Sequence, residues 1–305
     1  MTDIVDGVRT FTMAERLDAA ATAEITAAKG DRTVSVCIPC RDEAATIGPL
    51  VSVIRRELMG ADGLVDELIV LDDRSTDDTA RVASHAGARV VSIDDVHREH
   101  GEGHGKGNAL WATLLVSHGD VIVWCDGDVT SFESDWVTRL AAPLLADDSV
   151  MMVKALYHRP TNYGGGGRTT ELVARPLMSR YFPSLTGLAQ PLSGEYAGRR
   201  SALEAVSFVQ GWGVEMGLLI DIAQRWGADA IGQVDLGSRV HRHRSLHSLS
   251  VQAAEVMATV LDRAGIPPPA GEAEQVLQRA DGSDVPLNLA ARPSLEALGL
   301  AAGSR

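Results

Sequence analysis

Two aspartates separated by a glycine, Asp126, Gly127 and Asp128, have the type and spacing of a divalent-cation site. They end the apolar run 121–128, which predicts a buried strand. Hard cations prefer carboxylate and phosphate oxygens, and Gly127 allows a tight backbone path between the two acids. An Asp-Gly pair is also common turn chemistry. The residues alone therefore leave two interpretations open, a metal site and a turn.

Two glycine-flanked basic residues could bind anions. Lys106 lies in GEGHGKGN, and Arg168 lies in GGGGRTTE beside Thr169 and Thr170. Both precede predicted helices, whose first backbone N–H groups attract phosphate. The first run is not a P-loop, because Asn108 stands where that pattern needs Ser or Thr. The alternatives are a solvated lysine and a linker before a capped helix.

Apolar β-rich runs that alternate with helical patterns must position these residues. We predict strands at 33–40, 66–73, 89–93, 121–128 and 149–159 and a first helix over 41–58, with Ser75 or Thr76 capping the next one. Such alternation predicts an α/β fold with a mostly parallel sheet covered on both faces. Ligands then bind at the carboxyl ends of the strands, where Pro39 to Glu43, Asp72 to Thr76 and Asp126 to Asp128 fall.

Four segments divide the chain. We predict an N-terminal helical segment (1–30), a Rossmann-like half of alternating strands and helices (31–160), a mixed half that opens with a glycine-rich loop (161–245), and a C-terminal helix with a flexible tail (246–305). The tail prediction depends on the Pro, Gly and Ala content after residue 267.

Composition narrows the function. The chain has 305 residues and a net charge of −13, which argues against nucleic-acid binding and requires that any site for phosphates carry local cations. No stretch reaches the roughly 18 apolar residues of a membrane span, and the N-terminus lacks a secretory pattern. Three cysteines cannot form a disulfide framework. We expect a cytoplasmic protein without a membrane span.

Seven blocks of the sequence occur in the order seen in actinobacterial glucosyl-3-phosphoglycerate synthases, which the chain resembles over roughly residues 33–265. They are PCRDEAATI, GKGNALW, DGD, GGGGRTTELVARPL, QPLSGEYAGRR, GWGVEMGLLID and VDLGSRVHRHRSL. The resemblance implies a GT-A fold, a Rossmann-like mixed sheet flanked by helices, with a helical C-terminal extension. It also implies a homodimer that uses Mg²⁺ or Mn²⁺ to transfer glucose, with retention, from UDP-glucose to the 2-hydroxyl of 3-phosphoglycerate.

The resemblance makes 31–160 the nucleotide-sugar-binding half, 161–245 the acceptor-binding half and 246–305 the segment that makes dimer contacts. It also assigns roles at the matching positions. The implied metal ligands are Asp128 and His241. The implied donor-binding residues are Pro39, Cys40, Glu43, Asp73, Lys106, Asp126, Gly127, Leu192 and Glu215, of which Lys106, Leu192 and Glu215 are also catalytic candidates. The implied acceptor-binding residues are Gly167, Arg168, Thr170 and Gly194. The chain departs from the family pattern at Arg74, where Gly is usual, and at His243 and Ser245, where relatives often have Asn and Pro.

Several alternatives stay open. Glu195 and Glu215 are both candidate carboxylates, and we assign Glu215 to the sugar hydroxyls. With no obvious base in the sequence, we hypothesise attack from the leaving-group face, with a diphosphate oxygen taking the proton. The HRHR run 241–244 could be a surface basic patch. The chain could also use another donor or acceptor, be a sugar-phosphate nucleotidyltransferase, or be a silent nucleotide-sugar sensor.

Overall fold

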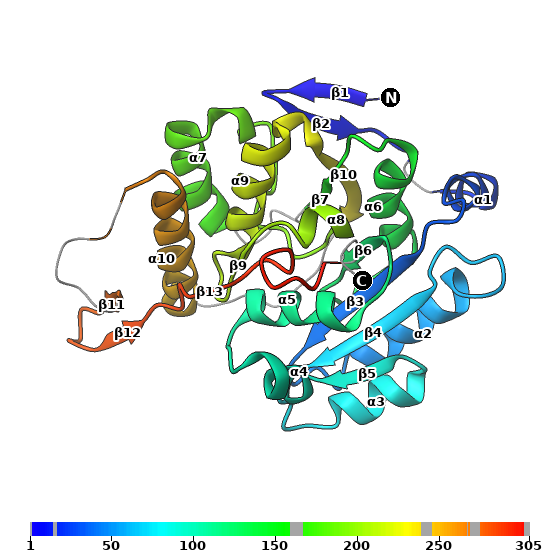
Figure 1. Cartoon of the computed structure of the whole chain (residues 1–305), viewed down its shortest axis with the longest axis horizontal. Coiled ribbons are helices and arrows are strands. Elements are labelled where there is room, and N and C mark those ends of the chain that lie inside the picture. The colour runs from blue at the N-terminus through cyan, green and yellow to red at the C-terminus, as the bar shows by residue number, and fades with distance from the viewer. Residues whose placement is uncertain are drawn as a thin grey trace.

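A single nine-stranded sheet organises the molecule (Figure 1). The computed structural model describes residues 2–14, 17–158, 167–238, 246–266, 268 and 275–301. The strand order is β1-β2-β10-β7-β8-β6-β3-β4-β5. The strands are β1 (Thr2–Val5), β2 (Val8–Phe11), β3 (Val34–Cys40), β4 (Glu67–Asp72), β5 (Arg89–Ser92), β6 (Val121–Trp124), β7 (Met152–His158), β8 (Tyr196–Arg199) and β10 (Ile231–Ser238).

The sheet is mixed, with one antiparallel strand at its centre. Strands β6, β3, β4 and β5 pair in parallel, and so do β7, β10 and β2, but β8 runs antiparallel to both β6 and β7. The α/β prediction is confirmed. The carboxyl ends of β3, β4 and β6 meet at one edge, as the parallel register requires.

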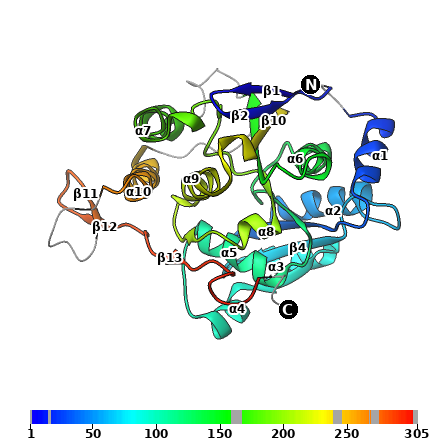
Figure 2. The same ribbon diagram turned by 45° about the horizontal axis from the view of Figure 1, so that its top comes forward.

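Helices cover both faces of the sheet (Figures 1 and 2). The side chains of β3 point alternately into two hydrophobic cores, one on each face of the sheet. Cys37 packs in the core under α5 and α9, and Val36 and Ile38 pack in the core under α2 and α6. The helical segments are α1 (Ala19–Ala28), α2 (Ile47–Leu58), α3 (Thr79–Ala86), α4 (Ile93–His100), α5 (Lys106–Val116), α6 (Asp135–Ala146), η2 (Thr170–Ala174), α7 (Arg175–Tyr181), η3 (Pro183–Leu185), α8 (Arg200–Leu203), α9 (Val214–Trp226), η4 (Ala228–Ala230) and α10 (Leu246–Arg263).

Three predicted boundaries are wrong for local reasons. Strand β6 ends at Trp124, opposite Tyr196, where its antiparallel partner β8 begins, so the two aspartates lie in the following turn. Helix α2 begins at Ile47, because the preceding residues form a tight loop. Helix α3 takes Asp78 as its N-terminal cap. Ser75 and Thr76, predicted to cap it, bind Asp42 in the neighbouring loop.

The two ends of the chain also differ from the prediction. Residues 2–11 form a hairpin whose second strand pairs with β10, so only α1 of the expected N-terminal helical segment is helical. At the other end, β13 (Ala291–Arg292) pairs with β9 (Phe208–Val209), and Leu295 is buried in the core. The expected flexible tail is therefore wrong at this point, because Arg292 and Leu295 are buried. A small outer hairpin, β11 (Val276–Gln278) and β12 (Asp284–Pro286), precedes them.

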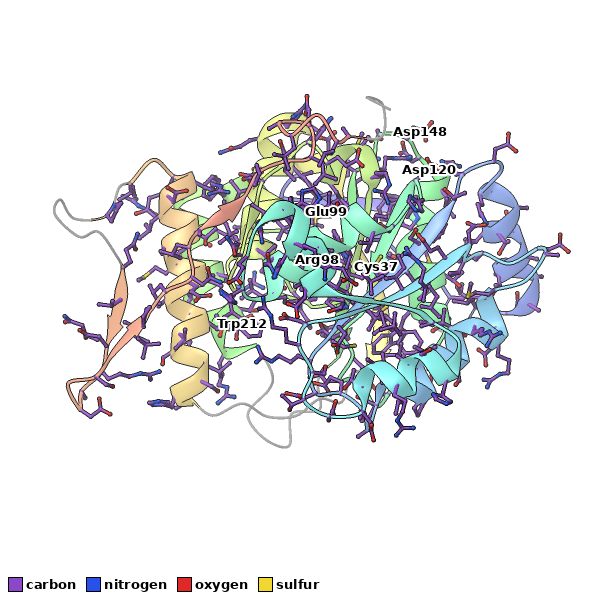
Figure 3. All side chains as sticks on the ribbon, turned by 60° about the horizontal axis from the view of Figure 1, so that its bottom comes forward. Cys37, Arg98, Glu99, Asp120, Asp148 and Trp212 are labelled. Atoms are coloured by element: carbon purple, nitrogen blue, oxygen red, sulfur yellow. The ribbon has the colours of Figure 1, made fainter. Side chains whose placement is uncertain are left out.

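The cysteines show no redox site. All three, Cys37, Cys40 and Cys125, are free and buried, and Cys37 lies inside the molecule (Figure 3). Burial, helped by the charge of Glu67, raises the pKa of the Cys37 thiol to about 12. A thiol held in its neutral form is a poor nucleophile. Within the described ranges, no helix has both the length and the apolar character needed to cross a membrane.

Candidate active site

Four carboxylates surround one buried thiol at the carboxyl ends of β3, β4 and β6. Cys40 is the last residue of β3, and the pKa of its thiol is raised well above the usual value by burial and then by Glu43, Asp72, Asp126 and Asp128. We call these four residues the acidic cluster. So many negative charges in a partly buried place repel one another, and a cation is their natural partner.

Two loops that follow parallel strands support this edge. Asp42, at the end of β3, adopts φ +57° and accepts hydrogen bonds from the backbone N–H and the hydroxyl of Thr76. The backbone N–H of Glu43 donates to the Thr79 hydroxyl at 2.7 Å. These bonds fix the loop that carries Glu43 against the loop after β4, where the family resemblance places the nucleotide.

Asp73 and Arg74 continue the same loop. The backbone N–H of Asp73 donates to the Cys40 carbonyl at 2.8 Å, and burial raises the pKa of the Asp73 carboxyl despite nearby arginines. Arg74 adopts φ +58°, the left-handed region that glycine tolerates best, which explains why glycine is usual there. Its guanidinium donates to Asp94 at 2.9 Å and contacts His97.

The Asp-Gly-Asp segment is a turn fastened to this edge. The hydroxyl of Thr46 donates to the Gly127 carbonyl at 2.6 Å. A Cβ atom on Gly127 would lie 2.6 Å from Cys40 Sγ, so a larger residue does not fit without movement. The turn interpretation is thus correct, and the same turn brings both aspartates to the acidic cluster, so it does not exclude a metal site.

Lys106 joins two acids that are far apart in the sequence. It begins α5, and its Nζ atom lies 3.2 Å from Asp126 Oδ1 and 2.9 Å from Glu215 Oε1, on α9. The side chain of Glu215 is only 4% exposed. Burial opposes the lysine charge, but the attraction of Asp126 and Glu215 outweighs burial and raises the pKa of Lys106 well above its usual value. A fixed positive charge therefore stands beside the acidic cluster.

The segment before β8 completes this side of the site. A Cβ atom on Gly194 would lie 1.9 Å from Asp126 Oδ2, so only glycine allows the segment to approach that carboxylate. Leu192 is partly buried against the core. Glu195 is fully buried, and its Oε2 accepts a hydrogen bond of 3.0 Å from the Tyr157 hydroxyl. Gly194 thus lies beside Asp126, which the resemblance assigned to the donor, although it assigned Gly194 to the acceptor.

The predicted acceptor residues lie on another segment. Thr170 is 7% exposed and begins η2, and the backbone N–H of Glu171 donates to the Gly167 carbonyl. Arg168 directly precedes this turn. Their role in acceptor binding stays a prediction. His241 lies outside the described residues, as do His243 and Ser245, so the metal role of His241 also stays a prediction.

Sequence reasoning missed the polar residues of β7. Lys154 is fully buried, and its Nζ donates to the Ser193 carbonyl at 2.7 Å, while Tyr157 binds Glu195. The available signal was a lysine inside the otherwise apolar strand MVKALYH. A charged residue in such a run needs a buried partner.

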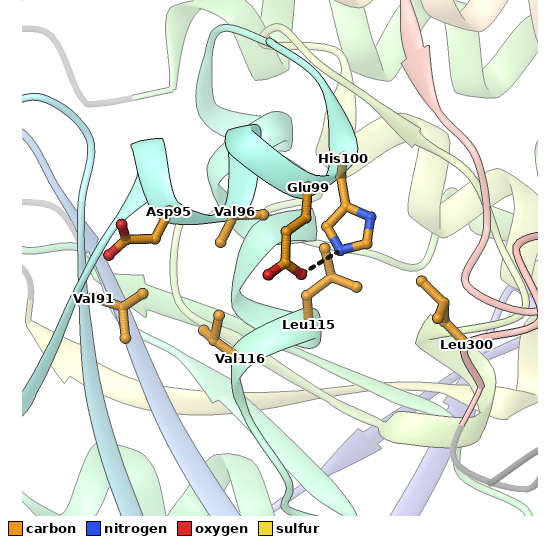
Figure 4. Close-up of a pocket in the computed structure, with 8 residues that line it drawn as sticks. All are labelled: Val91, Asp95, Val96, Glu99, His100, Leu115, Val116 and Leu300. Carbon is orange, nitrogen blue, oxygen red and sulfur yellow. Dashed lines mark ion pairs between the residues drawn. The ribbon is translucent and has the colours of Figure 1, made fainter.

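A separate pocket of about 310 Å³ lies beside α4 and the end of α5 (Figure 4). Its rim includes Glu99 and His100, whose Oε2 and Nε2 atoms are 3.9 Å apart. It is lined by Val91, Asp95, Val96, Glu99, His100, Leu115, Val116 and Leu300. None of these is a predicted site residue, so the pocket is not part of the site at the acidic cluster.

Known proteins are similar to this chain in sequence and in fold. The model of the glycosyl transferase family 2 matches residues 35–207. The glucosyl-3-phosphoglycerate synthase of Mycolicibacterium paratuberculosis is 46% identical over 90% of this chain and 88% of its own length. That of Petrotoga mobilis is 44% identical over 77% of this chain and 74% of its own length.

A solved structure of the same enzyme family has the same fold as this chain. The crystal structure of glucosyl-3-phosphoglycerate synthase from Mycobacterium tuberculosis with Mn²⁺, UDP-glucose and phosphoglyceric acid is similar with a TM-score of 0.85 and 42% identity, over 95% of this chain and 98% of that one. The same enzyme has also been solved with Mn²⁺, UDP and glucosyl-3-phosphoglycerate. The match thus spans both halves of the sheet and the C-terminal helix. The chain belongs to the glycosyl transferase family 2 and, within it, to the glucosyl-3-phosphoglycerate synthases.

Proposed function

We propose that this chain transfers glucose from UDP-glucose to the 2-hydroxyl of 3-phosphoglycerate. The observation that carries the proposal is the convergence of Lys106, Asp126 and Glu215 beside Asp128, at the sheet edge where nucleotide ligands bind. A relative that matches this chain over almost its whole length has been solved with UDP-glucose and phosphoglyceric acid and, separately, with UDP and glucosyl-3-phosphoglycerate. Both substrates are anionic, which fits a local cation and a metal on a chain of net charge −13.

Mg²⁺ or Mn²⁺ fits the chemistry of the acidic cluster. Its side-chain donors are carboxylate oxygens, which these hard cations prefer. We propose Asp128 and His241 as the protein ligands. When bound, the cation would neutralise charge on the departing diphosphate. Within the described ranges, no three His, Cys, Asp or Glu side chains form a metal site by themselves, so phosphate oxygens of the donor are expected to complete it.

The remaining roles follow from charge and position. Lys106 would stabilise the leaving diphosphate, and Glu215 would hold Lys106 and bind the glucosyl hydroxyls. Pro39, Cys40, Glu43 and Asp73 would hold the nucleotide, with Gly127, Leu192 and Gly194 shaping the space for the sugar. Gly167, Arg168 and Thr170 would orient the acceptor by its anionic groups.

We propose that the transfer retains configuration without a protein nucleophile. The bond from the anomeric carbon to the diphosphate oxygen breaks, and the acceptor hydroxyl oxygen bonds to the anomeric carbon from the same face. The hydroxyl proton passes to the diphosphate oxygen. Two contacts support this: Glu215 is ion-paired with Lys106, and Glu195 is buried and hydrogen-bonded to Tyr157. Trapping a glycosyl group on either glutamate would overturn this step.

The experiment is an assay of UDP release. With UDP-glucose, 3-phosphoglycerate and Mn²⁺ or Mg²⁺, the purified chain is expected to release UDP and form a glucosylated acid whose anomeric configuration NMR can assign. Chelation with EDTA is expected to abolish the signal, and added Mn²⁺ to restore it. Release that needs no 3-phosphoglycerate, or that prefers another nucleotide-sugar such as GDP-glucose, would contradict the assigned substrates.

We also propose a homodimer that forms at the end of the molecule carrying α7 and α10 (Figure 2). Apolar side chains are exposed there: Leu172 is 74%, Leu246 68% and Met257 46% exposed. A dimer contact that covered these side chains would remove their apolar surface from water, which favours association. A cytosolic location is proposed too, since three buried free thiols suit a reducing compartment.

The dimer predicts a change in mass. Sedimentation velocity is expected to give twice the chain mass of 32.4 kDa, and Met257→Glu to shift the protein toward the monomer, because a charge would then be buried at the contact. Arg98→Glu is a suitable control, since Arg98 is an exposed residue of α4. A wild-type protein that sediments as a monomer at assay concentration would contradict this prediction.

A further inference from the structure

A lysine without an exposed surface lies directly beneath the proposed site. Lys154, on β7, is 0% exposed, and its Nζ lies 3.9 Å from the centre of the Tyr196 ring on β8. Burial, partly offset by Glu215, lowers the pKa of Lys154 to about 7. A charged or strongly polar amine in this position costs stability that a leucine or methionine would not. Its presence therefore calls for a role other than packing.

The amine binds the segment 190–195, which precedes β8. Its Nζ donates to the Ser193 carbonyl at 2.7 Å, in the middle of that segment. Other β7 groups hold the two ends: the Gln190 side-chain amide donates to the Tyr157 carbonyl at 2.6 Å, and the backbone N–H of Ala155 donates to the Glu195 carbonyl at 3.1 Å. Lys154 thus fixes the part between these two anchors.

The same segment borders the donor residues. Gly194 follows Ser193 and packs so closely on Asp126 that a single added carbon would lie 1.9 Å from its carboxylate. Leu192 precedes Ser193. A displacement of the Ser193 carbonyl would therefore move Leu192 and Gly194 together, relative to Asp126 and its partner Lys106. Sub-ångström placement of such groups controls reactivity in enzymes.

We infer that Lys154 is a positioning residue: by holding the Ser193 carbonyl it sets the place of Leu192 and Gly194 against the glucosyl part of the donor. The inference rests on the proposed function, because it assumes that the donor carries a sugar at this edge. It assigns Lys154 no contact with substrate. The bond to Ser193 uses an N–H group, which both the neutral amine and the ammonium supply.

The experiment compares Lys154→Met with wild type for two ligands, UDP and UDP-glucose, both with Mn²⁺. We expect UDP to bind within about twofold of wild type by calorimetry, because it lacks the sugar. We expect kcat/KM for UDP-glucose to fall on the order of 10- to 100-fold. The thermal midpoint is expected to stay within about 4 °C, since methionine fills similar volume and removes a buried charge.

Lys29→Met is the matched control. The Lys29 ammonium pairs with Asp66 at 2.6 Å, beside the amino end of β4, and its loss is expected to leave kcat/KM unchanged. If Lys154→Met does not fold, Lys154→Gln replaces it, because its shorter side chain keeps a donor but does not reach as far, and the same selective loss is expected.

Two results would overturn the inference: a folded Lys154 variant with kcat/KM within twofold of wild type, or a loss of UDP affinity as large as the loss of kcat/KM for UDP-glucose. The second result would mean that Lys154 supports the whole nucleotide pocket. Failure of the proposed function looks different, because the wild-type protein itself would then release no UDP from UDP-glucose in the presence of 3-phosphoglycerate.

Discussion

Lys106→Met is expected to lower kcat for glucose transfer by roughly 100- to 1,000-fold, the usual effect of removing one preorganised group that stabilises a leaving anion. Its ammonium lies 3.2 Å from Asp126 and 2.9 Å from Glu215, so it occupies a fixed place before the donor arrives. A fixed charge needs no reorganisation as the sugar–phosphate bond breaks. Stopped assays of UDP release at saturating UDP-glucose would measure the change.

Lys106→Met is also expected to reduce the stability of the fold. The experiment must therefore separate a loss of folded protein from a loss of catalysis. Without Lys106, the Glu215 carboxylate, only 4% exposed, is left buried without its cation, at a cost of about 3 kcal/mol or more. The double variant Lys106→Met with Glu215→Gln removes both charges and is expected to recover most of that stability, yet none of the activity.

Urea unfolding of the wild type, Lys106→Met, Glu215→Gln and the double variant makes up a double-mutant cycle, which measures the coupling between the two side chains. A double variant that regains activity together with stability would show that Lys106 acts only through folding. Lys29→Met serves again as the control for the Lys-to-Met change, since its ion pair with Asp66 is remote from the acidic cluster.

Arg292→Met is expected to give the largest loss of stability among the C-terminal substitutions, about 2–4 kcal/mol. The guanidinium is buried and donates to Asn108 Oδ1 at 2.8 Å, to the His100 carbonyl at 3.0 Å and to the Gly101 carbonyl at 2.8 Å. It also lies over the Trp111 ring. Methionine would leave three acceptors without this donor, among them the buried Asn108 side-chain oxygen.

Arg225→Met provides a matched control. Arg225 also lies over a tryptophan, Trp226, and pairs with Glu296, but it is 47% exposed, so its loss is expected to cost under about 1 kcal/mol. Arg292→Lys is expected to destabilise as well, because an ammonium cannot reproduce the planar fork of guanidinium donors. Equal unfolding midpoints in urea for Arg292→Met and Arg225→Met would refute the structural role of residue 292.

Arg292 also bears on the active site. Its partner Asn108 lies on the first turn of α5, two residues after Lys106, and the side-chain amide of Asn108 contacts His97 at 3.1 Å. His97 in turn contacts Arg74. The C-terminal segment thus supports both the helix that presents Lys106 and the loop after β4, so truncation before residue 290 should reduce activity as well as stability.

The local sequence by itself determined which acidic residues lie at the site. The apolar runs that lead to Glu43, Asp72 and Asp126 predict buried strands, and parallel strands place their carboxyl ends at one edge, so the meeting of these acids could be predicted without coordinates. The blocks shared with glucosyl-3-phosphoglycerate synthases added Lys106 and Glu215. Local patterns did not give the N-terminal cap of α3 or the last residue of β6. The hydrogen bonds that join Ser75 and Thr76 to Asp42 decide the first, and the start of β8 decides the second.

Only the tertiary structure decided which groups meet. Lys106 on α5 pairs with Glu215 on α9, and Lys154 on β7 binds the Ser193 carbonyl in the segment 190–195. Arg292 fixes a C-terminal tail whose composition had predicted disorder. Such contacts depend on how helices pack on the sheet and on which buried polar groups find partners there. Sequence periodicity records which face of an element is buried, but it does not record what lies opposite that face.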